Sequence, residues 1–197
     1  MRGMNIGRIG SFRTCASLAL ALLAAAGPGA AHLRAAQKDL FKSAPLRNYG
    51  VIWPHELTRS GLPRNEQGWI WLREQGVRSI VTFRTEHEVN YREFGFQNVM
   101  RIPLTGSVMP TEKQAVEYLK FIQDPANQPV HIHCAAGRSR TGLMAALARY
   151  SIDGWSLDNA LDEARQYRDG KQLPAAKVAW LRAWAKAHPP GSFKVDR

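Results

Sequence analysis

Apolar residues along the chain follow two alternating patterns. Short apolar runs bounded by Gly, Pro or polar residues are typical of buried strands, whereas apolar residues recurring every three or four positions are typical of helices with one packed face. Strands that alternate with helices indicate a parallel or mixed sheet covered on both sides. The patterns predict strands at 51–53, 57–60, 78–84, 98–102 and 129–133, and helices that begin near 65, 111, 143, 156 and 174.

Helix boundaries are marked by residues that satisfy free backbone groups. The segment 111–114 reads Thr-Glu-Lys-Gln, a capping box in which the first and last side chains each bond the other residue's backbone N–H. We predict that Asn65 and Ser156 cap two further helices. Gly76 is expected to end the first of these and Pro174 to start the last helix of the chain. The predicted inner faces are Val116, Leu119, Phe121 and Ile122, then Leu157, Ala160, Leu161 and Ala164, then Val178, Trp180, Leu181 and Trp184.

Residues 1–31 have the layout of a secretory signal peptide. Three arginines without an acidic residue precede an apolar run from Cys15 to Ala26, and the small residues Gly29 and Ala31 suit cleavage after Ala31. The apolar run is shorter than the roughly 20 residues that span a bilayer. We therefore predict a periplasmic or secreted protein with no membrane span after cleavage. The alternative is an uncleaved inner-membrane anchor that leaves the protein facing the periplasm.

Length and charge favour one domain that acts on an anion. We predict a flexible lead-in at 32–48, one folded domain at 49–190 and a C-terminal tail at 191–197. The formal net charge is +11, but the basic residues are scattered and not interleaved with aromatic residues. This pattern does not favour nucleic acid as a partner, and an anionic substrate accounts for the positive charge.

Residues 129–150 combine a strand, a loop and a helix around one cysteine. The loop lies at the helix N-terminus, where unpaired N–H groups and the macrodipole favour an anion and lower the pKa of a thiol. We therefore predict that Cys134 is a thiolate at neutral pH. Cys15, the other of the two cysteines, lies in the predicted signal peptide, so the mature chain has no partner for an internal disulfide.

The loop after this strand has the residue types needed to transfer a phosphoryl group to cysteine. A thiolate at Cys134 can attack phosphorus in line while the Arg140 guanidinium holds the equatorial oxygens. Gly137 lets the backbone curl, and Thr141 donates to the sulfur when the phosphoenzyme breaks down. We expect the His133 ring to order the loop rather than to act as a base. We expect no metal ion and no cofactor. The predicted substrate-binding residues are Ala135, Ala136, Gly137, Arg138, Ser139 and Arg140.

Three segments resemble one protein family. Residues 133–141 resemble the His-Cys-x-x-Gly-x-x-Arg-Ser/Thr loop of the cysteine-dependent protein tyrosine and dual-specificity phosphatases. Residues 57–63 and 76–84 are similar to the Arg-Ser-Gly-x-Pro element and the Gly-Ile-x-x-Val-Ile-x-Leu-Arg strand of atypical dual-specificity phosphatases from bacteria, fungi and plants. The resemblance implies an α/β, single-domain fold with a mostly parallel sheet flanked by helices. It also implies phosphatase activity through a phosphocysteine intermediate.

The general acid of such enzymes has no clear counterpart. The resemblance implies an Asp roughly thirty residues before the cysteine, but the segment 103–107 there contains no carboxylate. Glu112 is the nearest candidate, although an acid in the first turn of a helix is also favourable for the dipole alone. Further candidates are Asp124, Glu86, His87 and Glu88. The missing Asp leaves a second hypothesis open, namely a pseudophosphatase that binds phosphate or another anion without turnover.

Arg138 bears on the choice of substrate. The resemblance implies that a basic residue at this loop position meets a second phosphate in relatives that act on inositol phosphates or phosphoinositides. The alternative is a solvated surface arginine. A phosphorylated protein and an inositol phosphate are therefore both predicted substrate classes, and the sequence indicates no oligomeric state.

Overall fold

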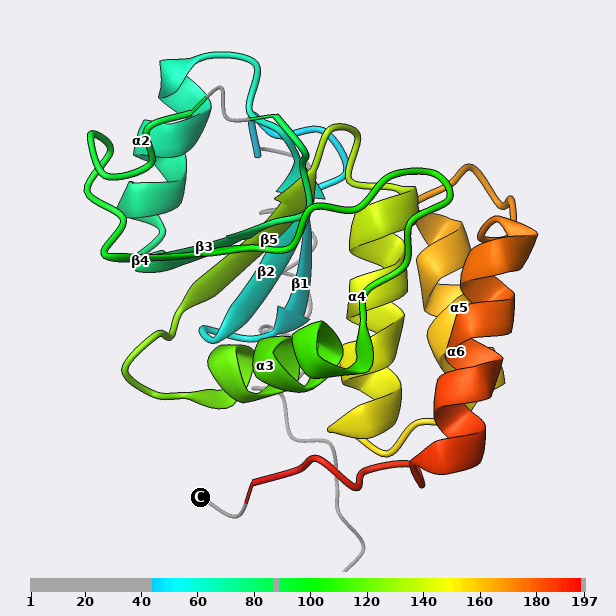
Figure 1. Ribbon diagram of the computed structural model, residues 1–197. Helices are drawn as coiled ribbons and strands as arrows, with labels where there is room; N and C mark the ends of the chain where they lie inside the picture. The colour runs from blue at the N-terminus through cyan, green and yellow to red at the C-terminus, as the bar shows by residue number, and fades with distance from the viewer. Residues whose placement is uncertain (1–43, 87–88, 196–197) are drawn as a thin grey trace, which may run out of the picture.

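The computed structural model describes residues 44–86 and 89–195, and these contain a five-stranded sheet (Figure 1). The strands are β1 Gly50–Trp53, β2 Leu57–Gly61, β3 Ser79–Thr82, β4 Asn98–Arg101 and β5 Val130–Cys134. Their order in the sheet is β1-β2-β5-β3-β4, in which β1 is antiparallel to β2 and the other neighbours are parallel. The predicted α/β fold with a mostly parallel sheet is therefore confirmed.

Helices cover both faces of this sheet, as the alternating pattern predicted. They are α2 Glu66–Glu74, α3 Glu112–Gln123, α4 Ser139–Ser151, α5 Leu157–Gln166 and α6 Ala175–Ala187. On one face, α2 packs with Tyr91 and Phe96 over Ile80 of β3. The other four helices pack on the opposite face in a larger cluster of buried residues (Figure 1).

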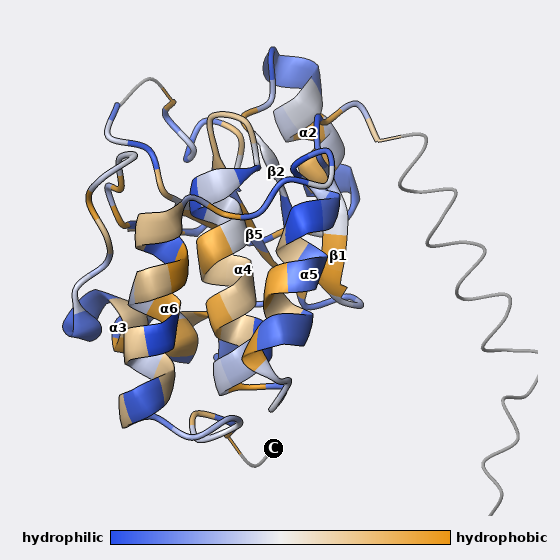
Figure 2. Cartoon of the chain, turned by 90° about the vertical axis from the view of Figure 1, so that its right-hand side faces the viewer, coloured by the Kyte–Doolittle hydropathy of each residue, from blue (hydrophilic) through white to orange (hydrophobic). Residues whose placement is uncertain are grey.

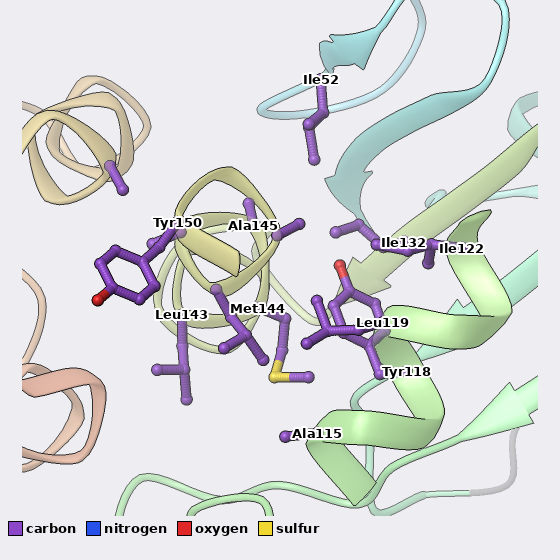
Figure 3. Packing of buried hydrophobic residues seen from close by; sticks show 14 of the residues in the cluster. Ile52, Ala115, Tyr118, Leu119, Ile122, Ile132, Leu143, Met144, Ala145 and Tyr150 are labelled. Atoms are coloured by element: carbon purple, nitrogen blue, oxygen red, sulfur yellow. The ribbon is translucent and has the colours of Figure 1, made fainter. Parts of the chain in front are cut away.

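The central element of the larger core is α4. All of its residues from Thr141 to Ala148 are buried, and a helix that is apolar all round belongs inside a protein. Figure 2 shows α4 between α5 and α6, with hydrophilic residues gathered on the two outer helices. On its other side, Met144 faces Tyr118 and Leu119 of α3 (Figure 3). The helix that follows the phosphate-binding loop is thus held on several sides.

The capping box of α3 is confirmed, but its inner face differs from the prediction. Thr111 Oγ1 accepts from Gln114 N over 3.2 Å, and Gln114 Oε1 accepts from Thr111 N over 2.9 Å. Leu119 and Ile122 are buried as predicted, whereas Val116 and Phe121 are only partly buried. Ala115 and Tyr118 take their place, since positions 115, 118, 119 and 122 form one helical face.

Of the three other predicted helix starts, one differs from the prediction. Ser156 caps α5 as predicted, with its Oγ accepting from Asn159 N over 3.2 Å. Asn65 precedes α2, but its side chain makes no capping hydrogen bond. Pro174 precedes α6, where Leu181 and Trp184 are buried as predicted, whereas Val178 and Trp180 are only partly buried. The same face of α6 also buries a lysine, which the apolar pattern did not predict.

The ends of the described chain pack onto the domain. Leu46 is buried beside α2, so residues 44–48 of the predicted lead-in belong to the packed part of the protein. In the predicted tail, Gly191 N donates to Tyr150 O and Phe193 N donates to Ser151 O, each over 2.9 Å. The predicted signal peptide and residues 32–43 lie outside the described residues. Within the described residues, no helix has both the length and the apolar character to span a membrane.

Candidate active site

The phosphate-binding loop, residues 134–140, connects the end of β5 to the first turn of α4. In the parallel register of β2 and β5, Cys134 lies opposite Gly61. The N–H of Leu62 donates to the carbonyl oxygen of Ala135 over 3.1 Å. The loop therefore lies against β2 at the carboxyl edge of the sheet, where ligand sites of α/β proteins form.

The backbone of this loop curls at Gly137. Its φ of +69° lies in the left-handed region that favours glycine. A Cβ atom at this position would collide with the backbone of Ser60 and Gly61. Glycine is therefore required both by the dihedral angle and by the close approach of β2.

Cys134 is only 2% exposed and lies at the base of the loop. Burial by itself raises the pKa of its thiol. The hydroxyl and N–H of Thr141, the charge of Arg140 and the N–H of Gly137 act in the opposite direction, so the pKa lies below its ordinary value. The Thr141 hydroxyl is buried and has no hydrogen-bond partner among the described residues, and its contribution is to lower the pKa of the neighbouring thiol. These contacts favour a thiolate nucleophile.

Arg140 lies at the other end of the loop, beside a cleft. Its Nη1 donates to Phe83 O over 3.3 Å and to Leu104 O over 3.2 Å. The cleft has a volume of about 400 Å³ and is lined by Thr85, Glu86, residues 104–106, Ser139, Arg140 and Lys177 among others. A larger cavity of about 680 Å³, lined by Trp53 and Lys194 among others, contains no predicted site residue. The smaller cleft adjoins the loop through Ser139 and Arg140 and is therefore the candidate substrate cleft.

Two residues behind the loop were not predicted as site residues. Arg59 of β2 is fully buried, and its Nη2 donates to Gly137 O over 2.8 Å. Its guanidinium lies 3.8 Å from the ring centroid of Tyr167. Asn48 Nδ2 donates to Ala136 O over 2.7 Å. An arginine within a buried strand was the available signal for Arg59, whereas no sequence pattern pointed to Asn48.

His133 is fully buried directly before the nucleophile. Its Nε2 lies 3.0 Å from the Tyr91 hydroxyl, and burial lowers the pKa of its imidazole to about 3. The ring is therefore neutral at physiological pH. The ring is thus held by Tyr91 beside the loop, and its role in ordering the loop stays a prediction.

The candidate acids lie at different places. Glu112 is exposed, lies 3.5 Å from His188 Nε2 and does not line the cleft, so its geometry does not favour the predicted role. Asp124 ends α3 and accepts from Ala126 N over 2.8 Å. Glu86 lines the cleft, but its own backbone N–H and the charge of Arg84 lower its carboxyl pKa, which disfavours a proton donor. His87 and Glu88 lie outside the described residues.

Arg138 and Ser139 contact the segment between α5 and α6. Arg138 Nη2 forms an ion pair with Asp169 Oδ2 over 2.7 Å, in which the Arg138 side chain is half-buried and the Asp169 side chain is exposed. Arg168 donates to the Ser139 hydroxyl. The structure therefore places Arg138 at the rim of the site with a carboxylate partner.

The sequence profile of one family, described as "DSP-PTPase phosphatase fused to NAD+ Kinase", matches residues 55–182. The chain belongs to this family. The matched region includes the phosphate-binding loop, the strand that carries Arg59 and the helix that carries Lys177. The protein is therefore a cysteine-dependent phosphatase of the tyrosine and dual-specificity class.

Named relatives support this assignment. The chain is 29% identical over 136 residues to "Probable tyrosine-protein phosphatase DG1060" from Dictyostelium discoideum, covering 64% of this chain and 80% of the relative. It is 27% identical over 120 residues to "Inositol diphosphatase SIW14" from Saccharomyces cerevisiae, covering 57% of this chain and 42% of the relative. It is 31% identical over 108 residues to "Dual specificity protein phosphatase TpbA" from Pseudomonas aeruginosa, covering 54% and 49%. The chain thus spans half or less of the length of the last two relatives.

A solved structure agrees with the fold of this phosphatase. The core catalytic domain of SIW14 from S. cerevisiae, in complex with citrate, has a TM-score of 0.61 and 25% sequence identity. The match covers 73% of this chain and 93% of that domain. The single-domain phosphatase fold is therefore confirmed.

Proposed function

We propose that this protein is an exported phosphatase that removes a phosphate from a small, multiply phosphorylated substrate of the inositol-phosphate type. The catalytic part of this proposal rests on the environment of Cys134, whose buried thiol has a lowered pKa at the base of the loop that leads into α4. Backbone N–H groups and Arg140 surround the position where a phosphate binds, and they stabilise the charge of its equatorial oxygens.

The reaction proceeds in two displacement steps. The Cys134 thiolate attacks phosphorus, the S–P bond forms, and the P–O bond to the leaving group breaks. The leaving oxygen departs opposite the sulfur, toward the opening of the loop. Water then attacks the phosphocysteine, the P–S bond breaks, and the Thr141 hydroxyl stabilises the sulfur as it regains its negative charge. The protein returns to its starting state with one phosphate released.

Cations around the cleft support a highly charged substrate. Arg84, Arg101 and Arg140 are close enough to His133 to lower its pKa after the larger effect of burial. Arg168 contacts Ser139 of the loop. Such a concentration of positive charge attracts substrates with several phosphates.

The leaving group also favours this substrate class. Because residues 103–107 contain no carboxylate, a leaving group that needs little protonation suits the site best. A phosphoanhydride, such as the diphosphate of an inositol diphosphate, meets that requirement. Relatives from Arabidopsis thaliana, S. cerevisiae and rice are named inositol diphosphatases, which supports the proposal.

Turnover by the protein that begins at His32 tests this function. We expect release of phosphate from an inositol diphosphate and from p-nitrophenyl phosphate, with a higher kcat/KM for the former. A phosphotyrosine peptide serves as the competing substrate class, and a higher kcat/KM for it would overturn the substrate assignment. Cys134→Ser should abolish turnover because a hydroxyl cannot replace the thiolate, while vanadate still binds. Vanadate binding without any turnover by the wild type would instead identify a pseudophosphatase.

Export is proposed from the N-terminal sequence. Residues 1–31 have the charged, apolar and small-residue regions of a signal peptide. We expect mass spectrometry of the protein purified from its native host to find an N-terminus at His32 or within a few residues of it. An intact Met1 on protein from the cytoplasmic fraction would contradict export.

A further inference from the structure

Lys177 of α6 occupies a position that the helix pattern assigns to the core. It shares one helical face with Leu181 and Trp184, four and seven residues later, and all three are buried. Lys177 is completely buried, which is rare for a lysine unless it is paired. A buried ammonium group destabilises the fold unless other groups compensate its charge.

The surroundings of Lys177 provide only weak compensation. Its Nζ donates to Thr105 O over 3.2 Å and to Gly106 O over 3.4 Å, and lies 4.0 Å from Met109 Sδ. No Asp or Glu within residues 44–86 and 89–195 forms an ion pair with it. Burial and the charges of Arg140 and Arg168 lower the pKa of Lys177, whereas the charge of Cys134 raises it. The anion that favours charged Lys177 is therefore the nucleophile itself.

Lys177 also lines the same cleft as Arg140. The segment that follows β4 lines this cleft with residues 104–106, and it passes close to the N-terminal ends of α4 and α6 (Figure 1). Arg140 donates to this segment at Leu104, and Lys177 donates to it at the next two residues. This segment contains residues 103–107, where an acid was expected and no carboxylate is found.

We propose that Lys177 stabilises the negative charge that develops on the leaving oxygen, and so replaces the missing general acid by electrostatic means. The inference rests on the proposed phosphocysteine mechanism and adds a residue to it. In-line attack places the leaving oxygen opposite the sulfur, toward the cleft that Lys177 lines. A fixed charge in a water-poor site acts strongly there without direct contact and without reorganisation. No proton is transferred from Lys177.

The test compares Lys177→Gln, Lys177→Met and Lys177→Arg on a series of aryl phosphates whose phenols differ in acidity. Gln can still donate to the carbonyl oxygens of residues 105 and 106 but has no charge, whereas Met can do neither and Arg keeps the charge. Lys186→Gln removes a charge from the exposed side of α6 and is the matched control. Melting temperatures are measured for all variants.

We expect Lys177→Gln and Lys177→Met to lower kcat/KM, which reports departure of the phenol, by about 10- to 100-fold on phenyl phosphate, up to the lower end of the range for loss of an oxyanion donor. The loss should fall below about threefold on p-nitrophenyl phosphate, whose leaving group needs less stabilisation. Lys177→Arg should retain most activity and Lys186→Gln all of it. The dependence of kcat/KM on the acidity of the phenol becomes steeper only when the charge at position 177 is absent.

Two outcomes overturn the inference while leaving the proposed function intact. Wild-type activity of Lys177→Gln would show that Lys177 only holds residues 105 and 106. Equal losses on all aryl phosphates would show that it only shapes the site. A wild type that turns over none of these substrates, by contrast, would overturn the proposed function itself and this inference with it.

Discussion

Arg59 Nη2 donates to the carbonyl oxygen of Gly137 over 2.8 Å, so a side chain of β2 supports the phosphate-binding loop from behind. Tyr167 covers the guanidinium on one side, and Nε and Nη1 have no hydrogen-bond partner within the described residues. Burial lowers the pKa of Arg59 and is the largest effect. Tyr167, Glu163 and then the charge of Cys134 act in the opposite direction and favour the charged form of Arg59. Arg59 therefore links the shape of the loop to the charge of its nucleophile.

Replacing Arg59 should impair catalysis although it does not touch the substrate. Arg59→Lys keeps the charge but loses the hydrogen bond to Gly137 and the stacking on Tyr167. Because one hydrogen bond of a charged group contributes roughly 1.5–3 kcal/mol, we expect kcat/KM to fall about 10- to 100-fold. Arg59→Met should in addition raise the pKa of Cys134, seen as a shift of the pH profile of thiol alkylation to higher pH. Alkylation profiles and kcat/KM values that match the wild type would rule out this role.

Gly137→Ala should disrupt the loop. The substitution combines a positive φ with a collision between its Cβ and the backbone of Ser60 and Gly61. The left-handed conformation alone costs about 1–2 kcal/mol, and displacement of the loop misaligns the N–H groups that bind phosphate. We expect turnover to fall at least ~10²-fold and the melting temperature to drop. Gly106→Ala is the stability control because its Cβ would meet no atom within 4 Å. Equal melting temperatures for the two variants would contradict the prediction.

Replacing Arg138 and replacing Asp169 should change kcat/KM for multiply phosphorylated substrates in opposite directions, because the two side chains form an ion pair. If Arg138 meets a second phosphate, it must leave Asp169, and an exposed pair of this kind contributes only about 0–1 kcal/mol. Arg138→Ala should therefore lower kcat/KM for an inositol polyphosphate about 10- to 100-fold more than for an aryl phosphate. Asp169→Asn should raise it for the inositol polyphosphate alone, by up to about fivefold.

Both variants should be assayed at two salt concentrations. A solvated surface arginine would act only through long-range attraction, which salt screens over ~10 Å. Losses in Arg138→Ala that are equal for both substrates and shrink together at high salt would favour a singly phosphorylated substrate.

The buried histidines of β5 should make stability depend on pH. Burial lowers the pKa of His131 well below its ordinary value and that of His133 to about 3. Both rings therefore bind a proton more readily in the unfolded chain, whose histidine pKa is about 6.5. The contribution of the two neutral rings to the free energy of unfolding is fully present above that pH. It falls as the pH drops toward the folded pKa values, by up to about 1.4 kcal/mol per pH unit for each ring.

Urea unfolding between pH 7 and pH 5 measures this effect before most carboxylates titrate. His131→Asn should reduce the slope of unfolding free energy against pH by about half, whatever its effect on stability at pH 7. His188→Gln is the control, because its ring lies at the end of α6 outside the sheet. An unchanged slope in His131→Asn would mean that this ring is not held neutral by burial.

Each feature that the sequence predicted lies within a short stretch of the chain. The loop from Cys134 to Arg140, the capping box at Thr111 and the alternation of strands with helices depend on neighbouring residues, and local backbone physics fixes them. The predictions for Gly137 and His133 are of the same local kind, because Gly137 lies in the loop, where its φ is positive, and His133 directly precedes the loop.

Only the tertiary structure shows which distant residues meet at the loop. The strand order brings Arg59 beneath Gly137, 78 residues later. Packing of α6 buries Lys177 beside Thr105 and brings His188 next to Glu112, which lies away from the cleft. The segment between α5 and α6 brings Asp169 to Arg138. The hydrophobic periodicity of the sequence does not predict these pairs, because they form only when several apolar faces are buried together in one core. That shared burial, a property of the whole chain, decides which charges surround the cysteine.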